Sequence, residues 1–222
     1  MTILALDTTT EFGSVALRID GRTAAELPLH SPDGFAHVIF GHIDQLLKRT
    51  GVALGNIDCF GAAAGPGSFT GVRVGLTAAK GLAEAVKKPV ATISNLRALA
   101  FFGNSDRRAA ILDARRGDVY VGLYNAELQP IQPEAVTKLP LWLEHIDDAD
   151  CELITTAGAP FRAALAGSRF AGNTWIEAPR SLAAAVAYCA ELDLERGAAV
   201  DPISADANYV RRSDAELFWK DR

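Results

Sequence analysis

The feature that most constrains the fold is a pattern that occurs twice, once at the start of the chain and once near its middle. The stretches ILALDTTTEFGSVALRID and AAILDARRGDVYVGLYN each give an apolar strand, an aspartate at its end, a polar turn with a glycine, and a second strand. In this comparison Asp7 corresponds to Asp113, and Gly13 corresponds to Gly117. A repeated unit at the start of each half predicts a duplicated α/β fold.

Two duplicated α/β halves that face each other across a cleft form the two-lobed, actin-like architecture of the ASKHA group, with an RNase H-like sheet in each lobe. We expect residues 1–100 to form a first lobe that carries the partner interface. Residues 101–222 would form the second lobe, and the C-terminal tail could return to the first. The boundary is expected near residues 95–106, because the stretch GNSDRR at the end of this region is polar and contains glycine, as exposed connections do.

The composition limits the classes of function. The chain has 222 residues and a formal net charge of −5, so a broad basic surface for nucleic acid is not expected. Its three cysteines, Cys59, Cys151 and Cys189, are far apart and form no C-x-x-C pair, which predicts buried, reduced thiols in a cytoplasmic protein. The first residues lack a signal-peptide pattern, and no apolar run is long enough to span a membrane.

A glycine-rich loop and a nearly apolar helix occupy residues 62–86, AAAGPGSFTGVRVGLTAAKGLAEAV. The loop lacks the lysine of a P-loop and the third glycine of a dinucleotide fingerprint. Ser68 or Thr70 could cap the helix and leave N–H groups for an anion, or the glycines could form a tight turn that packs closely against other backbone. The residues that could contact a nucleotide or another anion are Asp7, Thr8, Gly67, Ser68, Thr70 and Asp113.

The helix after this loop has two apolar faces. At about 100° per residue, its polar side chains fall in one narrow arc, and the apolar arc is wider than a helix on a single core needs. The edge that suits the protein's own core is Val72, Leu76, Ala79, Ala83 and Val86. The other edge, a stripe of mostly small residues that could meet a partner chain or a second helix of the same chain, is Gly71, Val74, Gly75, Ala78, Leu82 and Ala85. If a partner binds there, Gly75→Leu should block binding and leave the fold intact.

Other patterns give little evidence for catalysis. His37 and His42 are five residues apart, so on a helix they face different sides and do not form a metal-binding i, i+4 pair. Ser68 does not lie in a G-x-S-x-G motif, which argues against a serine hydrolase. The arginine pairs 107–108, 115–116 and 211–212 could contact phosphate or remain solvated. We therefore predict no catalytic residue and no metal ligand.

Four motifs together identify a family. LALDTTT, GPGSFTGVRVG, DARRGDVY and NYVRR are spread over nearly the whole chain, and they resemble the motifs of the TsaB family of bacterial tRNA threonylcarbamoyladenosine biosynthesis. The resemblance implies an actin-like fold and a non-catalytic role beside the paralogue TsaD, which transfers a threonylcarbamoyl group to N6 of adenosine-37 in tRNAs that read codons beginning with A. It also implies a homodimer in the absence of TsaD, and contact with tRNA only through the complex.

The same resemblance assigns the nucleotide chemistry to other subunits. ATP, ADP and magnesium belong to the complex with TsaD and the ATPase TsaE, and no cofactor is expected to bind this chain tightly. TsaD carries a metal-binding H-x-x-x-H on a first-lobe helix, whereas FAHVIFGHID here has H-x-x-x-x-H spacing, which supports an inactive partner. In this family first-lobe helices form both the homodimer and the TsaD contact, in agreement with the two-faced helix.

Two functions of other classes stay open. One is an ATP-dependent phosphoryl or carbamoyl transferase that uses Asp7 and Asp113 in the cleft between the lobes. The other is a metallopeptidase, a label that this family received through its paralogy and that the missing histidine spacing makes doubtful.

Overall fold

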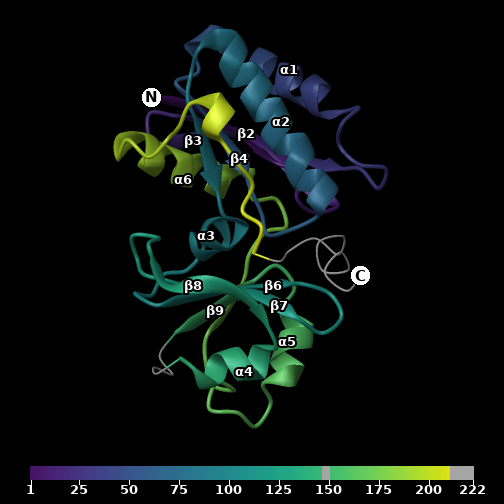
Figure 1. Ribbon diagram of the computed structural model, residues 1–222, viewed down its shortest axis with the longest axis vertical. Coiled ribbons are helices and arrows are strands. Elements are labelled where there is room, and N and C mark those ends of the chain that lie inside the picture. Colours follow the sequence, from purple (N-terminus) through teal and green to yellow (C-terminus); the bar gives the residue numbers. More distant parts are fainter. Residues whose placement is uncertain (147–150, 211–222) are drawn as a thin grey trace, which may run out of the picture.

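The computed structural model describes residues 1–146 and 151–210, and its strands form two five-stranded sheets (Figure 1). The order is β3-β2-β1-β4-β5 in the first sheet and β8-β7-β6-β9-β10 in the second, so each strand of one half has a counterpart in the other. In each sheet the first strand along the chain pairs antiparallel with the second and parallel with the fourth. The duplicated, two-lobed α/β fold predicted from the repeat is confirmed.

The bounds of the elements are as follows. The first sheet contains β1 (Thr2–Asp7), β2 (Phe12–Ile19), β3 (Arg22–His30), β4 (Cys59–Ala63) and β5 (Val90–Ile93). The second contains β6 (Arg108–Asp113), β7 (Val119–Tyr124), β8 (Pro130–Thr137), β9 (Glu152–Thr155) and β10 (Trp175–Glu177). The helices are α1 (Ile39–Thr50), α2 (Phe69–Val86), α3 (Asn95–Ala100), α4 (Leu139–Glu144), α5 (Gly158–Ala164) and α6 (Ala183–Glu195), with short 3-10 turns η1 (Leu54–Asn56) and η2 (Pro202–Ser204).

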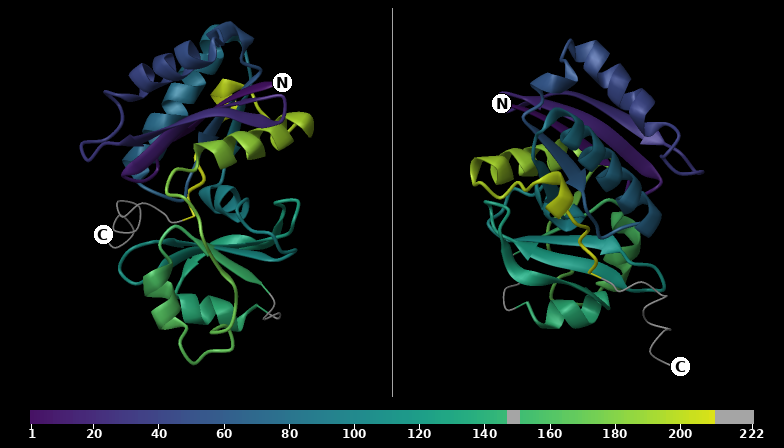
Figure 2. Two further views of the ribbon diagram at one scale, coloured as in Figure 1. Left: turned by 180° about the vertical axis from the view of Figure 1, so that it is seen from behind. Right: turned by 45° about the horizontal axis from the view of Figure 1, so that its top comes forward.

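Helices and sheets alternate along the long axis of the molecule (Figures 1 and 2). α1 and α2 cover the outer face of the first sheet, and α4 and α5 cover the outer face of the second. α3 and α6 lie between the two sheets. Each of the three helical layers packs an apolar core against the sheet or sheets that it covers. The core of the central layer joins the two halves.

The two helices between the sheets each pack on the sheet of the opposite half of the chain. α3 follows the first sheet in sequence but contacts β6, β7 and β9, whereas α6 follows the second sheet but contacts β1, β2 and β4. After α6, Val200 bridges Val90 and η2 contacts α2, so this part of the chain remains on the first half. The boundary predicted after residue 100 therefore separates the two sheets but not the helices, and α3, which lies in the predicted boundary region, is largely buried.

Local signals explain where elements begin and end. Asp20 and Gly21 have φ values of 47° and 78°, as a two-residue hairpin turn between β2 and β3 requires. The Ser68 side chain caps α2, as predicted, by accepting a hydrogen bond from the N–H of Gly71. α1 begins only at Ile39, so His37 precedes the helix. Within the two described ranges, none of the helices has the length and apolar character that crossing a membrane demands.

Candidate functional site

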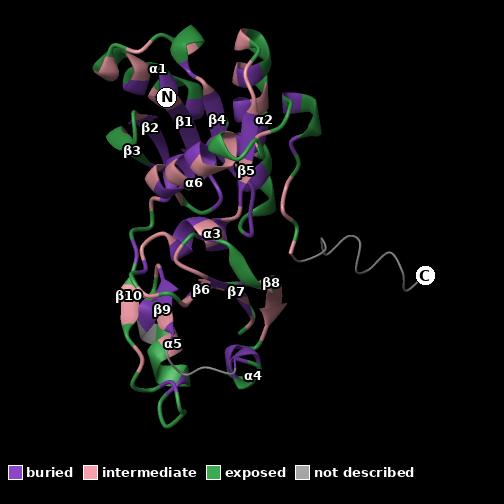
Figure 3. Ribbon diagram, turned by 90° about the vertical axis from the view of Figure 1, so that its left-hand side faces the viewer, coloured by how far each residue is buried: buried purple, intermediate pink, exposed green. Residues whose placement is uncertain are grey.

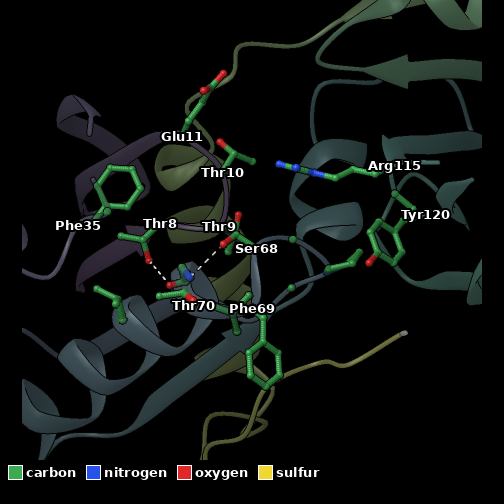
Figure 4. A pocket seen from close by; sticks show the side chains of 18 of the residues that line it. Thr8, Thr9, Thr10, Glu11, Phe35, Ser68, Phe69, Thr70, Arg115 and Tyr120 are labelled. Carbon is green, nitrogen blue, oxygen red and sulfur yellow. Dashed lines mark hydrogen bonds between the residues drawn. The ribbon is translucent and has the colours of Figure 1, made fainter. Parts of the chain in front are cut away.

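A cleft of about 1000 Å3 lies between the two halves. Residues 8–11, 31–36 and 65–72 line it from the first half, residues 113–116 and Tyr120 line it from the second, and residues 208–210 complete it. Figure 4 shows Thr10 and Glu11 on one side, with Arg115 and Tyr120 reaching in from the other. All residues predicted to contact an anion line this cleft except Asp7.

Asp7 is fully buried and does not line the cleft. Its Oδ1 accepts hydrogen bonds from the backbone N–H of Thr9 at 2.9 Å and from the Thr9 hydroxyl at 2.6 Å, while its buried Oδ2 has no hydrogen bond. Burial raises the pKa of Asp7 above its ordinary value of 3.8, although the hydrogen bonds from Thr9 oppose this rise. The structure therefore differs from the prediction that Asp7 presents a carboxylate to a ligand in the cleft.

The N-terminus of α6 lies on the same buried side of the first sheet. The N–H of Ala183 donates to Oγ of Ser14 at 3.0 Å, and the N–H of Ala184 donates to Oε1 of Glu26 at 3.3 Å. No side chain of the helix itself caps this end, so acceptors on the sheet satisfy N–H groups that a helix leaves free. Asp7 belongs to this contact between sheet and helix, which explains its burial.

The glycines of the GPGSFTGVRVG motif lie directly against the residues after β1. A Cβ atom on Gly67 would be 2.7 Å from the carbonyl oxygen of Thr9, one on Gly75 would be 2.5 Å from Oγ1 of Thr8, and one on Gly71 would meet the carbonyl oxygen of Thr8. The Thr8 hydroxyl donates to the carbonyl oxygen of Gly71 at 2.6 Å, and the N–H of Ser68 donates to the carbonyl oxygen of Thr9 at 2.7 Å. These contacts support the alternative of close backbone packing over an anion cradle.

The stripe of small residues on α2 is divided between interior and surface. Gly71, Gly75 and Ala78 are buried, Val74 and Leu82 are half-buried against the outer core, and Ala85 is exposed. The prediction that Gly75→Leu leaves the fold intact is wrong, because a side chain at this position would enter the space of Thr8 in the same chain. The face of α2 that reaches the surface runs instead through Thr70, Arg73, Thr77, Gly81 and Glu84 (Figure 3).

A buried polar network escaped the sequence analysis. The Asn95 side-chain amide donates to the hydroxyl oxygen of Thr9. The backbone N–H of Asn95 donates to the carbonyl oxygen of Gly65 at 2.8 Å, and the N–H of Gly65 donates to Oδ1 of Asn95 at 3.3 Å. Asn95 thus joins the end of β1, the glycine-rich loop and α3, and an asparagine at the start of a helix carries no sequence signal for such a role.

The remaining candidate groups are possible metal ligands, the cysteines and the arginine pairs. Within residues 1–146 and 151–210, no three His, Cys, Asp or Glu side chains converge as metal ligands do. All three cysteines are buried, as predicted, and burial raises the pKa of Cys59 and of Cys189 to about 12, so neither of these two forms a thiolate at neutral pH. Of the arginine pairs, residues 115–116 line the cleft, and residues 211–212 lie outside the described ranges.

Comparisons with known proteins find a family model of TsaD and curated relatives named TsaB. The family model of TsaD, tRNA N6-adenosine threonylcarbamoyltransferase, matches residues 27–164. The tRNA threonylcarbamoyladenosine biosynthesis protein TsaB of Bacillus subtilis is 35% identical over 155 residues, which cover 68% of each chain. TsaB of Escherichia coli is 35% identical over 163 residues, which cover 70% of each chain.

A solved structure gives the same result over the whole fold. YeaZ from Pseudomonas aeruginosa superimposes with a TM-score of 0.74 at 30% identity, and the match covers 94% of this chain and 99% of that chain. Sequence relatives named for tRNA threonylcarbamoyladenosine biosynthesis and a matching actin-like fold therefore lead to one conclusion: this chain belongs to the TsaB family.

Proposed function

We propose that this chain is the non-catalytic partner and activator of TsaD in the transfer of a threonylcarbamoyl group to N6 of adenosine-37 in tRNAs that read codons beginning with A. Membership of the TsaB family supports the pathway. The non-catalytic role is supported by one observation above all: the glycine motif at the start of α2 is occupied by Thr8 and Thr9 of the same chain. An alternative, an ATP-dependent phosphoryl or carbamoyl transferase, would need this motif or Asp7 for its substrate.

The residues of the cleft do not fit the ATP and magnesium that the actin-like fold family implies. A phosphate cradle needs free backbone N–H groups and usually a lysine, whereas here the N–H of Ser68 donates to Thr9 and the N–H of Gly71 donates to the Ser68 side chain. Asp7 is buried away from the cleft lining. We therefore assign ATP, ADP and magnesium to the complex with TsaD and TsaE, and no chemical step to this chain.

We place the contact with TsaD, and a homodimer contact in its absence, on the exposed face of α2. At Gly81 a Cβ atom would have no other atom within 4 Å, so the helix backbone is open to close approach by another chain. Val74, Leu82 and Ala85 of the predicted stripe border this face. tRNA would be contacted only through the assembled complex, in the cytoplasm.

Gly81→Leu tests this surface without disturbing the core. Leucine favours the helix by up to about 1 kcal/mol relative to glycine, so the isolated variant should melt at or above the wild-type temperature. The added side chain separates two closely packed surfaces, and we expect TsaD binding to weaken at least about tenfold. Gly172→Leu is the matched control, because Gly172 is an exposed glycine of the second half with equally open surroundings. Normal TsaD binding by Gly81→Leu would exclude this face.

A reconstituted modification assay tests the function itself. We expect tRNA modification by TsaD and TsaE to depend on this chain, and Asp7→Asn to retain most of the activity. The isolated chain, titrated with ATP and magnesium, should show no turnover. Turnover by the chain alone, or modification that continues at the full rate in its absence, would contradict the proposal.

A further inference from the structure

The carboxylate of Glu134, on the edge strand β8, accepts hydrogen bonds from three separate parts of the chain. The hydroxyl groups of Ser94 and Tyr124 both donate to Oε1 of Glu134. The side-chain amide of Asn208 donates to Oε2 over 2.7 Å. Ser94 caps α3, Tyr124 ends β7, and Asn208 follows η2 near the end of the described chain. One half-buried carboxylate thus joins three segments that are distant in sequence.

The direction of these hydrogen bonds follows from the other contacts of the donors. The Ser94 oxygen already accepts from the backbone N–H groups of Leu96 at 3.1 Å and Arg97 at 3.4 Å, which leaves its proton for Glu134. Burial raises the pKa of Tyr124, so its hydroxyl group keeps its proton. Because the surrounding groups donate, a carboxylate, which accepts through both oxygens, satisfies all of them as they are oriented here.

Asn208 also binds the first half of the molecule. Its backbone N–H donates to the carbonyl oxygen of Ala64, just after β4, over 2.7 Å. The chain passes so close to the glycine-rich loop that a Cβ atom on Gly65 would be 2.8 Å from the carbonyl oxygen of Asn208. Asn208 therefore connects a loop of the first half to a carboxylate of the second.

The next residue, Tyr209, lies on the N-terminal end of α2. The ring centroids of Tyr209 and Phe69 are 5.3 Å apart, and the Tyr209 hydroxyl accepts a hydrogen bond from Nε of Arg73 at 3.3 Å. The Arg73 guanidinium in turn lies 3.8 Å from the centroid of the Phe69 ring. All three residues are exposed, so a protein bound to this end of α2 would touch Tyr209 directly.

We propose that the hydrogen bond between Glu134 and Asn208 is a latch between the two halves, and that Tyr209 makes this latch respond to a protein bound on α2. A bound protein that moves Tyr209 also moves Asn208, its neighbour in the chain, and so alters the contact with Glu134 beside the cleft. The coupling is reciprocal: loss of the latch changes the affinity for the bound protein. The inference rests on the proposed function, since it takes TsaD as the protein on α2.

An exchange of carboxylate and amide tests the latch in the isolated chain. Asn208→Asp places two carboxylates together, and we expect hydrogen exchange in residues 205–210 to become about tenfold faster. Glu134→Gln should be mild, because two amides can pair once Asn208 flips. The double variant E134Q/N208D again places a donor opposite an acceptor and should restore the wild-type exchange rate.

Asn56→Asp is the control, because it makes the same chemical change at an exposed position of η1. Its exchange in residues 205–210 should equal that of the wild type. Wild-type exchange in Asn208→Asp, or a double variant that exchanges as fast as Asn208→Asp, would overturn the latch.

Addition of TsaD separates the coupling from the proposed function. In the wild type we expect TsaD to change exchange in residues 205–210 and 94–97, and Tyr209→Ala to remove this change while TsaD still binds. If TsaD does not bind the wild type, the proposed function and the coupling both fail, whereas the latch is judged by the isolated chain alone. If TsaD binds and exchange in both segments is unaltered, the proposed function survives and the coupling is overturned.

Discussion

The turns after β1 and β6 share a local structure and differ in their surroundings. In the first half, Oδ1 of Asp7 accepts the N–H of Thr9 at 2.9 Å, and in the second half Oδ1 of Asp113 accepts the N–H of Arg115 at 2.8 Å. Each aspartate thus closes a turn on the backbone two residues ahead. Asp7, however, is fully buried, whereas Asp113 is exposed and lines the cleft. Duplication has kept the turn and changed the environment of its carboxylate.

The difference arises from the elements that cover each turn. In the first half, α2 packs on Thr8 and Thr9 through its glycines, and the N-terminus of α6 lies against the sheet at Ser14. In the second half the corresponding helix, α5, is short and starts at Gly158, where a Cβ atom would meet no atom closer than 3.5 Å. The second turn therefore stays open to the cleft. The lesson is that a repeated motif predicts the strands and the aspartate hydrogen bond of both copies but not the burial of either.

The largest expected effect concerns the close packing of the first turn. Gly71→Ala would drive a methyl group into the backbone carbonyl of Thr8, which cannot move without moving β1. We expect a loss of about 3 kcal/mol or more in the free energy of unfolding. For a chain of this length, each kcal/mol corresponds to roughly 2–4 °C in melting temperature, so calorimetry would detect the change easily.

Two other glycines provide the comparison. Gly158→Ala, in the corresponding helix of the second half, meets only ordinary contacts, and Gly81→Ala, on the same helix as Gly71, meets none within 4 Å. Both should be neutral or stabilising, by up to about 1 kcal/mol. A small effect of Gly71→Ala, or an equal loss in Gly158→Ala, would show that the two halves do not differ in packing here.

The sequence predicted the backbone of this region better than its contacts. The repeat, the cap at Ser68 and the apolar strands depend on local patterns of residues, and each reappears in the structure. The partner of Gly75 could not be predicted in this way, because Thr8 is distant in sequence and any apolar or small neighbour would produce the same helical pattern. Periodicity also could not predict that α3 packs on the second sheet and α6 on the first. The pattern of apolar residues shows that a helix face is buried but not which element covers it.

A smaller effect is expected in the pH dependence of stability. Because the pKa of Asp7 is raised in the folded chain, the unfolded chain ionises first as pH rises above the ordinary value of 3.8. The wild type therefore loses stability as the pH rises from this value to the pKa of Asp7 in the folded chain. Asparagine does not titrate, so Asp7→Asn lacks this loss. Denaturant unfolding at a series of pH values should show that the stability of the variant relative to the wild type increases as the pH rises above about 4.

Asp113→Asn is the control in the second half, since it makes the same change in an equivalent but exposed turn. Its free energy of unfolding should stay within about 0.5 kcal/mol of the wild type. If the free energies of unfolding of Asp7→Asn and the wild type differ by the same amount over the whole pH range, burial does not raise the pKa of Asp7.

The smallest effect concerns backbone strain, which is present in the second turn only. Arg115 and Arg116 have φ values of 62° and 55°, a conformation that favours glycine, and no residue between Asp7 and Phe12 shares it. Arg115→Gly should therefore stabilise the chain by about 0.5–1 kcal/mol, after the entropic cost of glycine is subtracted. Lys87→Gly, at the left-handed C-cap of α2, should give a similar gain and serves as the control for strain relief.

The rate of tRNA modification tests whether the strained turn positions the Arg115 side chain in the cleft or only supports the fold. Strained residues are retained where their side chains are needed in one position, and Arg115 reaches into the cleft towards Thr10 (Figure 4). If the cleft contributes to the complex, Arg115→Gly should lower the rate of tRNA modification in the reconstituted system although the chain is more stable, and Lys87→Gly should not. A stabilised Arg115→Gly variant with full activity would mean that the second turn, like the first, only supports the fold. The two turns would then differ in how closely other elements pack on them and not in function.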